Sequence, residues 1–282
     1  MTGTPAQFWL ACAFGALTFI PRAPVLAEPA SSFPDIRAIQ QQGKLRIGLI
    51  ARDSPPLLVT GKNGQPTGIE VSMANGLARR LGVKPAFLRT AATHDELVAQ
   101  VAAGDVDIAL SSISRTASRA QVVRFSRPYL TQSMAVLLNR KRALREGADC
   151  PKTPADVAAM AARPRTLGVP RGTSYEQALR GLNKKAAPEV FDDLRKFLHA
   201  VVDGTLLAGL GGEISVRQVL KEHPAARIEL KLCLVGVQKD RIAIAVRPDR
   251  PNLGNWIDVV LEDSGFLLEP SGLFKLATDW QF

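Results

Sequence analysis

The sequence predicts an α/β protein made of two lobes, and three observations support this fold class. First, short β-rich runs alternate with segments of helical periodicity along the 282 residues, as in folds with a mostly parallel sheet flanked by helices. Second, the alternation stops after Tyr129 and then restarts, so the chain contains two α/β blocks. Third, no low-complexity linker lies between the blocks, which indicates that strands rather than a flexible tether connect them.

The first block contains clear turn and capping signals. Asn63–Gly64 predicts a hairpin turn, Ser72 is a suitable N-cap for the helix that follows, and Gly104 ends the next helix. The expected elements are strands at 44–50, 83–88 and 107–111, a hairpin within 61–68, and helices at 72–82 and 95–103.

The second block repeats the alternation without repeating the sequence. Thr153 or Pro154 opens its first helix, and a small polar turn at 172–174 precedes the second. The expected elements are strands at 134–138, 166–169, 190–191, 206–210 and 241–246, and helices at 153–161, 175–182, 194–203 and 253–263.

The first 27 residues have the features of a cleavable signal peptide. Residues 8–20 form an apolar run of the length of a signal-peptide core, too short for a bilayer helix. Pro21 and Pro24 follow it, and residues 25–27 (VLA) place small residues at both ends of a tripeptide, as signal peptidase requires. We therefore expect a signal peptide at 1–27 and a periplasmic location, with an N-terminal helix as the alternative.

Cleavage after residue 27 would leave two cysteines, Cys150 and Cys233. An even number of cysteines in an oxidising compartment predicts a disulfide, with two buried free thiols as the alternative. Their spacing fits no zinc pattern, and we expect no metal and no cofactor.

The formal net charge of +10 does not by itself indicate a nucleic-acid partner. The cations are scattered, and the densest cluster, 140–142 with Arg145, lacks interleaved aromatic residues. We expect no nucleic acid, and a positive field would instead attract anionic small molecules. The 46% hydrophobic and 22% charged content excludes long disordered and collagen-like chains.

Several segments, taken in order, resemble the periplasmic solute-binding proteins of the amino-acid type, family 3 of the bacterial extracellular solute-binding proteins. The resemblance covers residues 40–282 and rests on the segments at 44–50 (KLRIGLI), 64–71 (GQPTGIEV), 104–108 (GDVDI), 116–119 (TASR), 125–129 (FSRPY), 172–174 (GTS), 242–246 (IAIAV) and 279–282 (DWQF). It implies a type II fold with two lobes, each a mostly parallel sheet flanked by helices, joined by two hinge strands. Lobe 1 would comprise 34–131 and 245–282, lobe 2 would comprise 132–244, and the hinge would lie near 129–133 and 239–244.

Two polar segments are candidates for the ligand site. Arg119 follows a strand end, where ligands bind in open α/β sheets, and its guanidinium offers a planar fork for a carboxylate. The resemblance implies that Arg119 holds the ligand carboxylate and that Ser112 and Ser114 face the ligand amino group. Gly172 and Thr173 begin a helix, whose free N–H groups favour anions, and the resemblance places Thr173 on the same carboxylate.

Other positions depart from the family pattern. Leu57 and Ile69 stand where the family usually has aromatic residues, so the clamp on the ligand would be aliphatic. The acid that usually pairs with the ligand ammonium aligns with Gly212, and the neighbouring Glu213 is a candidate substitute. Asp53 and Glu70 are further carboxylates expected near the cleft. A carboxylate-bearing ligand is favoured, and an ordinary α-amino acid is in doubt.

These residues predict a non-enzymatic binding protein. It would be a monomer that captures a small carboxylate-bearing solute, an amino acid or related organic acid, by hinge closure and presents it to the permease of an ABC-type importer. One alternative is an enzyme similar to cyclohexadienyl dehydratases on the same fold, with Glu213 or Glu176 as the acid. The other is an accessory or sensory protein whose pocket has degenerated.

Overall fold

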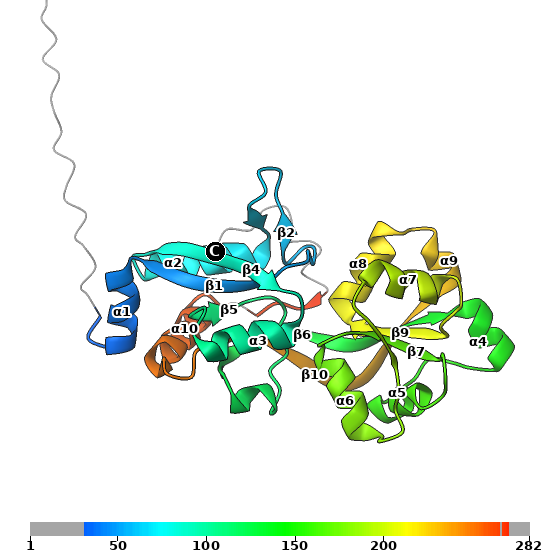
Figure 1. Cartoon of the computed structure of the whole chain (residues 1–282). Coiled ribbons are helices and arrows are strands. Elements are labelled where there is room, and N and C mark those ends of the chain that lie inside the picture. The colour runs from blue at the N-terminus through cyan, green and yellow to red at the C-terminus, as the bar shows by residue number, and fades with distance from the viewer. Residues whose placement is uncertain (1–30, 266, 271–282) are drawn as a thin grey trace, which may run out of the picture.

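Two lobes joined by two long strands form the molecule (Figure 1). The computed structural model describes residues 31–265 and 267–270, so the expected signal peptide at 1–27 and the segment 279–282 lie outside the described residues. The connecting strands are β6 (Arg124–Asn139) and β10 (Leu230–Val246), and both run through the two lobes. The predicted two-lobed α/β class is confirmed.

One eight-stranded mixed sheet extends through the molecule in the order β4-β1-β5-β10-β6-β9-β7-β8. The outer strands of each lobe pair in parallel, whereas β6 and β10 pair with each other in the antiparallel sense. This is required because the chain leaves lobe 1 through β6 and returns through β10. Gln132 opposes Asp240 where the strands cross between the lobes. The lobe boundaries at 131/132 and 244/245 fall within these strands and stay a prediction.

Lobe 1 follows the predicted order, with one shifted helix start and a first helix that was not predicted. Its elements are α1 (Pro34–Gln42), β1 (Lys44–Ile50), β2 (Val59–Thr60), β3 (Pro66–Thr67), α2 (Ile69–Arg80), β4 (Lys84–Ala91), α3 (His94–Ala103), β5 (Ile108–Ala109), the short 3₁₀ helix η1 (Arg119–Gln121) and α10 (Pro251–Asp263). The prediction that Ser72 caps α2 is wrong, because the helix begins three residues earlier, directly after Gly68. Gly68 has φ +116°, and a Cβ there would lie 2.5 Å from the Leu57 carbonyl oxygen, so only glycine fits this start.

Lobe 2 also follows the predicted order and adds three helices that the sequence reading missed. Its elements besides β6 and β10 are α4 (Arg140–Glu146), α5 (Pro154–Ala161), β7 (Leu167–Pro170), α6 (Ser174–Leu182), β8 (Glu189–Phe191), α7 (Leu194–Val202), β9 (Ala208–Gly212), α8 (Glu213–Glu222) and α9 (Ala226–Glu229). Helices α4, α8 and α9 and the first half of β10 were not predicted. Thr153 forms a full capping box with Asp156 at the start of α5, as expected for a threonine N-cap.

Each lobe has its own apolar core. In lobe 1, one cluster lies beneath α1, α2 and α10 and another beneath α3. In lobe 2, one cluster lies beneath α5 and α6 and another beneath α7 and α8. A disulfide joins Cys150 to Cys233 beside the first of these lobe 2 clusters, which confirms the predicted pairing. Within the described part of the chain, no helix is both long and apolar enough to span a bilayer.

Candidate functional site

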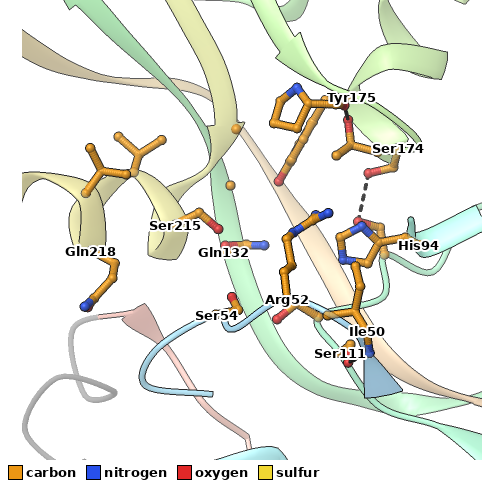
Figure 2. Close-up of a pocket in the computed structure, with 18 of the residues that line it drawn as sticks. Ile50, Arg52, Ser54, His94, Ser111, Gln132, Ser174, Tyr175, Ser215 and Gln218 are labelled. Atoms are coloured by element: carbon orange, nitrogen blue, oxygen red, sulfur yellow. Dashed lines mark hydrogen bonds between the residues drawn. The ribbon is translucent and has the colours of Figure 1, made fainter. Parts of the chain in front are cut away.

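A pocket of about 190 Å³ lies between the two lobes. Lobe 1 lines it with residues at the carboxyl ends of β1 and β5, lobe 2 lines it with the start of α6 and with β9 and α8, and the hinge strands contribute Gln132 and Asp240. Figure 2 shows that these side chains converge on a common space. Strand ends meet at one edge of an open sheet, and this placement is therefore the one expected for a ligand site.

Arg119 reaches the pocket, but most of its hydrogen-bonding capacity is already used. Its Nε and Nη2 donate to Asp95 Oδ1 at 3.2 and 2.9 Å, and Nη1 donates to the Ser114 carbonyl at 3.3 Å. Nη2 also donates across the lobe interface to the carbonyl oxygen of Gly172, at 3.3 Å. The side chain is only 4% exposed. Arg119 therefore connects the lobes in this closed arrangement.

The start of α6 forms the lobe 2 side of the same interface. Ser174 Oγ donates to Ser114 Oγ at 2.8 Å (Figure 2), and the side-chain amide of Gln177 donates to Asp95 at 2.9 Å. Gly172 has φ +67°, and a Cβ on it would lie 2.6 Å from Thr93 Cβ of lobe 1. Glycine at 172 therefore permits both the turn and the close approach of the lobes.

Thr173 lines the pocket with its hydroxyl engaged locally. That hydroxyl donates to the Pro170 carbonyl at 2.9 Å and accepts from the Glu176 amide at 3.4 Å. Thr173 is thus the N-cap of α6. Gly172 itself does not line the pocket and acts through its backbone.

Ser112 is held in an unusual backbone conformation by a buried carboxyl group. Its φ of +53° lies in the left-handed region, which non-glycine residues seldom adopt. The Ser112 amide donates to Glu70 Oε1 at 2.6 Å, and the Tyr129 hydroxyl donates to the same oxygen. Burial raises the pKa of Glu70 above its usual range. Glu70 therefore lies outside the pocket and positions the strand end from which Ser112 and Ser114 line it.

Asp240 is the carboxylate that faces the pocket from the hinge. The Tyr175 hydroxyl and Ser114 Oγ donate to its Oδ2 at 2.8 and 2.9 Å, and Gln132 also donates to it. Burial raises the pKa of Asp240, although these hydrogen bonds and the charge of Arg119 oppose the rise. Every direct partner of Asp240 is uncharged, so it is available to pair with a cation.

The geometry explains why an acid is absent at 212. A Cβ on Gly212 would lie 2.7 Å from the Gln132 amide, so Gln132 fills that space. Glu213 is not the substitute that the sequence suggested. Its carboxylate is buried at the hinge, where it accepts from the Ser133 amide at 3.3 Å and from Arg217 at 2.8 Å, and it does not line the pocket. Asp240, the register partner of Gln132 on the neighbouring hinge strand, is a carboxylate that does line the pocket.

The packing corrects two other expectations for the cleft, those for Leu57 and Ile69, whereas Asp53 lies at the pocket as expected. Leu57 and Ile69 are only 1% and 4% exposed in the lobe 1 core and do not line the pocket, so no aliphatic clamp forms from them. The same apolar cluster includes Ile214 from lobe 2, so these side chains serve lobe packing. Asp53 lines the pocket, but its carboxylate accepts from Thr60 and pairs with Arg89 at 3.0 Å.

Two lobe 1 residues that sequence reasoning did not select also face the pocket. Arg52 and His94 lie side by side in Figure 2, with the Arg52 guanidinium directed into the space below Tyr175. Burial and the charges of Arg52 and Arg119 lower the pKa of His94 to about 3, so His94 is neutral at physiological pH. Arg52 lies two residues past the end of β1, and that position was the available signal.

Lobe 2 contributes an apolar wall to the pocket, beside polar side chains of α6 and α8 such as Ser174, Gln218 and Glu222. The wall is formed by side chains from β6, β9, α7 and α8, namely Leu137, Phe197, Leu210, Val216 and Val219. The pocket thus combines a polar end, with charges of both signs, and an apolar end.

A charged pocket enclosed between two α/β lobes, which two hinge strands connect, defines a periplasmic binding protein of type II. The chain belongs to family 3 of the bacterial extracellular solute-binding proteins, whose model matches residues 45–264. This confirms the resemblance found in the sequence.

Similar proteins have been named and solved. The L-cystine-binding protein TcyJ of Escherichia coli (strain K12) is 28% identical over 172 residues, which make up 60% of this chain and 60% of that protein. The holo structure of ArgBP from T. maritima has a TM-score of 0.66 and 26% identity, and covers 81% of this chain and 93% of that one. The ancestral amino acid-binding protein AncCDT-1, described as a precursor of cyclohexadienyl dehydratase, has a TM-score of 0.65 and 26% identity, and covers 85% and 97%.

Proposed function

We propose that the protein captures a small zwitterionic solute of the amino-acid class between its lobes. The observation that carries this proposal is the presence of opposite charges at the polar end of one enclosed pocket. Arg52 and Arg119 line the pocket as cations, and Asp240 lines it as an anion whose hydrogen-bond donors are neutral. An ammonium group would bind Asp240 and a carboxylate would bind these arginines, with Ser112, Ser114 and Thr173 around them.

The apolar end would accept the side chain of such a solute. Its walls are mainly aliphatic and aromatic, with Ser215, Gln218 and Glu222 of α8 beside them, so a largely apolar side chain with a polar tip fits it. The binding proteins for cystine and arginine among the relatives support an amino acid as the solute class.

Hinge closure would couple binding to transport. The lobes would move about the segments 129–133 and 239–244 of β6 and β10, and the closed form would be presented to the permease of an ABC-type importer. The protein would act as a monomer in the periplasm after removal of residues 1–27. Neither Glu176 nor Glu213 lines the pocket, which supports binding without turnover.

A ligand screen tests this function. The mature protein is mixed with the twenty proteinogenic L-amino acids, L-cystine, and the amines and organic acids that lack one of the two charged groups, and thermal unfolding is followed. A compound at one hundred times its dissociation constant adds about 2.7 kcal/mol to the free energy of unfolding. We expect a shift with one or more zwitterions, and mass spectrometry should recover the compound unchanged. No shift with any zwitterion would overturn the proposal, and chemical turnover would favour the enzyme alternative.

A further inference from the structure

Three of the five residues of β9 are glycine, although glycine weakens a strand because it has no side chain to pack. Packing explains two of them. A Cβ on Gly209 would lie 2.7 Å from Phe197 Cζ, and a Cβ on Gly212 would lie 2.7 Å from the Gln132 amide. Neither position therefore has room for a larger residue.

Gly211, which lies between these two positions on the pocket side of the strand, has no such reason. Its φ is not in the left-handed region, so the backbone does not require glycine. Beyond its chain neighbours, the only atom of the described residues within 4 Å of a Cβ built there is Val216 Cγ2, at 3.5 Å, which is an ordinary contact. Gly211 is also the one residue of β9 that is not buried, although the strand lies between β6 and β7. Such a glycine marks a place where a ligand can approach the backbone closely.

The space in front of Gly211 continues into lobe 2 beneath α8. Four apolar side chains line the same pocket as Gly211, and all four belong to the cluster beneath α7 and α8: Leu137, Phe197, Val216 and Val219. Leu137 and Phe197 are buried, so this part of the pocket extends into the lobe rather than along its surface. We call it the apolar recess. Ser215 and Gln218 of α8 lie beside it (Figure 2).

Gly211 lies where the apolar recess meets the polar end of the pocket. The next residue, Gly212, lines the pocket together with Gln132, and Gln132 opposes Asp240 across the hinge strands. A solute with its ammonium group on Asp240 would hold its Cα near this junction. Its side chain would then pass Gly211 to enter the recess, and a side chain on residue 211 would occupy that passage.

We propose that Gly211 is a specificity-determining residue, which admits a bulky, largely apolar side chain of the solute into the apolar recess. The solute class is therefore an amino acid with a long aliphatic or aromatic side chain, because a small side chain would leave the apolar surface of the recess uncovered. This inference rests on the proposed function.

The test compares the wild type with Gly211→Ala and Gly211→Val. The probes are L-alanine, whose side chain does not reach the recess, and whichever of L-leucine, L-methionine, L-phenylalanine, L-arginine and L-cystine binds the wild type most tightly. We expect the wild type to bind this large probe at least about tenfold more tightly than L-alanine by calorimetry. Gly211→Val should weaken binding of the large probe by about 30-fold and Gly211→Ala by about threefold, with L-alanine nearly unchanged, because only the large probe needs the passage.

The matched control is Gly181→Val, which adds the same atoms to α6 at a position with open space around it. It should leave the affinities for both probes unchanged. Circular dichroism checks that each variant is folded. Val219→Ala approaches the recess from α8 and decides the question if Gly211→Val does not fold. It enlarges the recess, so it should increase the affinity for L-tryptophan relative to the large probe.

Three results would overturn this role of Gly211 and leave the proposed function intact. The first is a wild type that binds L-alanine as tightly as every larger probe. The second is an equal loss for L-alanine and the large probe in Gly211→Val, which would show that residue 211 affects closure rather than selection. The third is unchanged binding of the large probe in that variant. If no amino acid binds the wild type, both proposals fall together.

Discussion

The two lobes contribute different kinds of surface to the one pocket. Lobe 1 supplies two guanidinium groups, a neutral imidazole and serine hydroxyls from the ends of its strands. Lobe 2 supplies a small turn at 172–174, the glycine-rich end of β9 and an apolar wall. Asp240 belongs to neither surface, since it lies on a strand that crosses between the lobes.

This difference suggests how the work of binding is divided. In the proposed function, charged recognition would depend on lobe 1 and the hinge. Closure would depend on lobe 2, whose turn is small enough to approach Thr93 and Ser114 closely. Variants in the two lobes should therefore fail in different ways.

The largest expected effect concerns stability and is confined to lobe 2. The Cys150–Cys233 bond closes a loop with a sequence separation of 83, and replacing both residues by serine should remove about 4 kcal/mol from the free energy of unfolding by the chain-entropy argument. Urea unfolding measures the total loss in the free energy of unfolding. Hydrogen exchange should show the loss in β7 and β9, with β1 and β4 protected as before, and an equal loss in both lobes would contradict the assignment of the bond to lobe 2 alone.

The next effect concerns closure. Gly172→Ala would place a methyl group against Thr93 in a left-handed backbone position. We expect a cost of about 2 kcal/mol in the closed state, which corresponds to roughly 30-fold weaker binding of every ligand. Gly181→Ala is the matched control, since Gly181 lies in α6, the helix that Gly172 precedes, with open space around it, and the change should leave affinity unchanged. Normal affinity in Gly172→Ala would show that binding does not require this approach of the lobes.

A smaller effect is expected at the hinge. Asp240→Asn should weaken binding of ammonium-bearing ligands by about 1.5 kcal/mol, roughly tenfold, while Asn still accepts from Tyr175 and Ser114. Because burial raises the pKa of Asp240, its charged form destabilises the ligand-free fold at neutral pH, so the variant should unfold at the same or a higher temperature.

The same group sets a pH dependence with a definite sign. As the pH falls through the raised pKa of Asp240, the carboxylate gains a proton and affinity for the zwitterion should decrease. The facing groups do not reproduce this change, because His94 has a pKa of about 3 and the pKa of Tyr175 is raised well above its usual value. Calorimetry at several pH values checks it, and a pH profile that persists in Asp240→Asn would assign it to another group.

The smallest effect is expected at Ser112. Glycine would relieve the left-handed backbone at φ +53° and would add entropy to the unfolded chain, so Ser112→Gly should change the free energy of unfolding by less than about 0.5 kcal/mol. Binding should also change little if Ser112 contributes its backbone. A tenfold loss of affinity would show that its hydroxyl contacts the ligand.

Local patterns in the sequence were enough to predict most of the fold. The alternation of strands and helices, the Asn63–Gly64 turn and the Thr153 cap all depend on residues close in the chain, and the structure confirms them. The disulfide was predictable because signal cleavage would leave only two cysteines to pair. Helix α8 was missed although Glu213 in its first turn and Lys221 in its last turn are typical helix signals.

The residues of the site were predicted only in part, because a residue is available to a ligand only if no neighbouring group pairs with its charge. Arg119, Ser112, Ser114 and Thr173 all reach the pocket, as their positions at strand and helix ends predicted. Leu57, Ile69 and Glu213 do not line the pocket. Leu57 and Ile69 pack in the lobe 1 core, and Glu213 is bound at the hinge. No local sequence pattern shows whether such a side chain will lie in the pocket, the core or the hinge.

By itself, the sequence determined the α/β class, the family and the strand ends at which polar residues gather, because these follow from local periodicity and ordered motifs. The tertiary structure alone decided which charges remain unpaired. Gln132 fills the space beside Gly212, Asp95 neutralises Arg119, and Arg52 and Asp240 line the pocket without an ion pair among the described residues. Ion pairs form between residues far apart in the chain, so the sequence alone does not show which charges pair when the lobes come together.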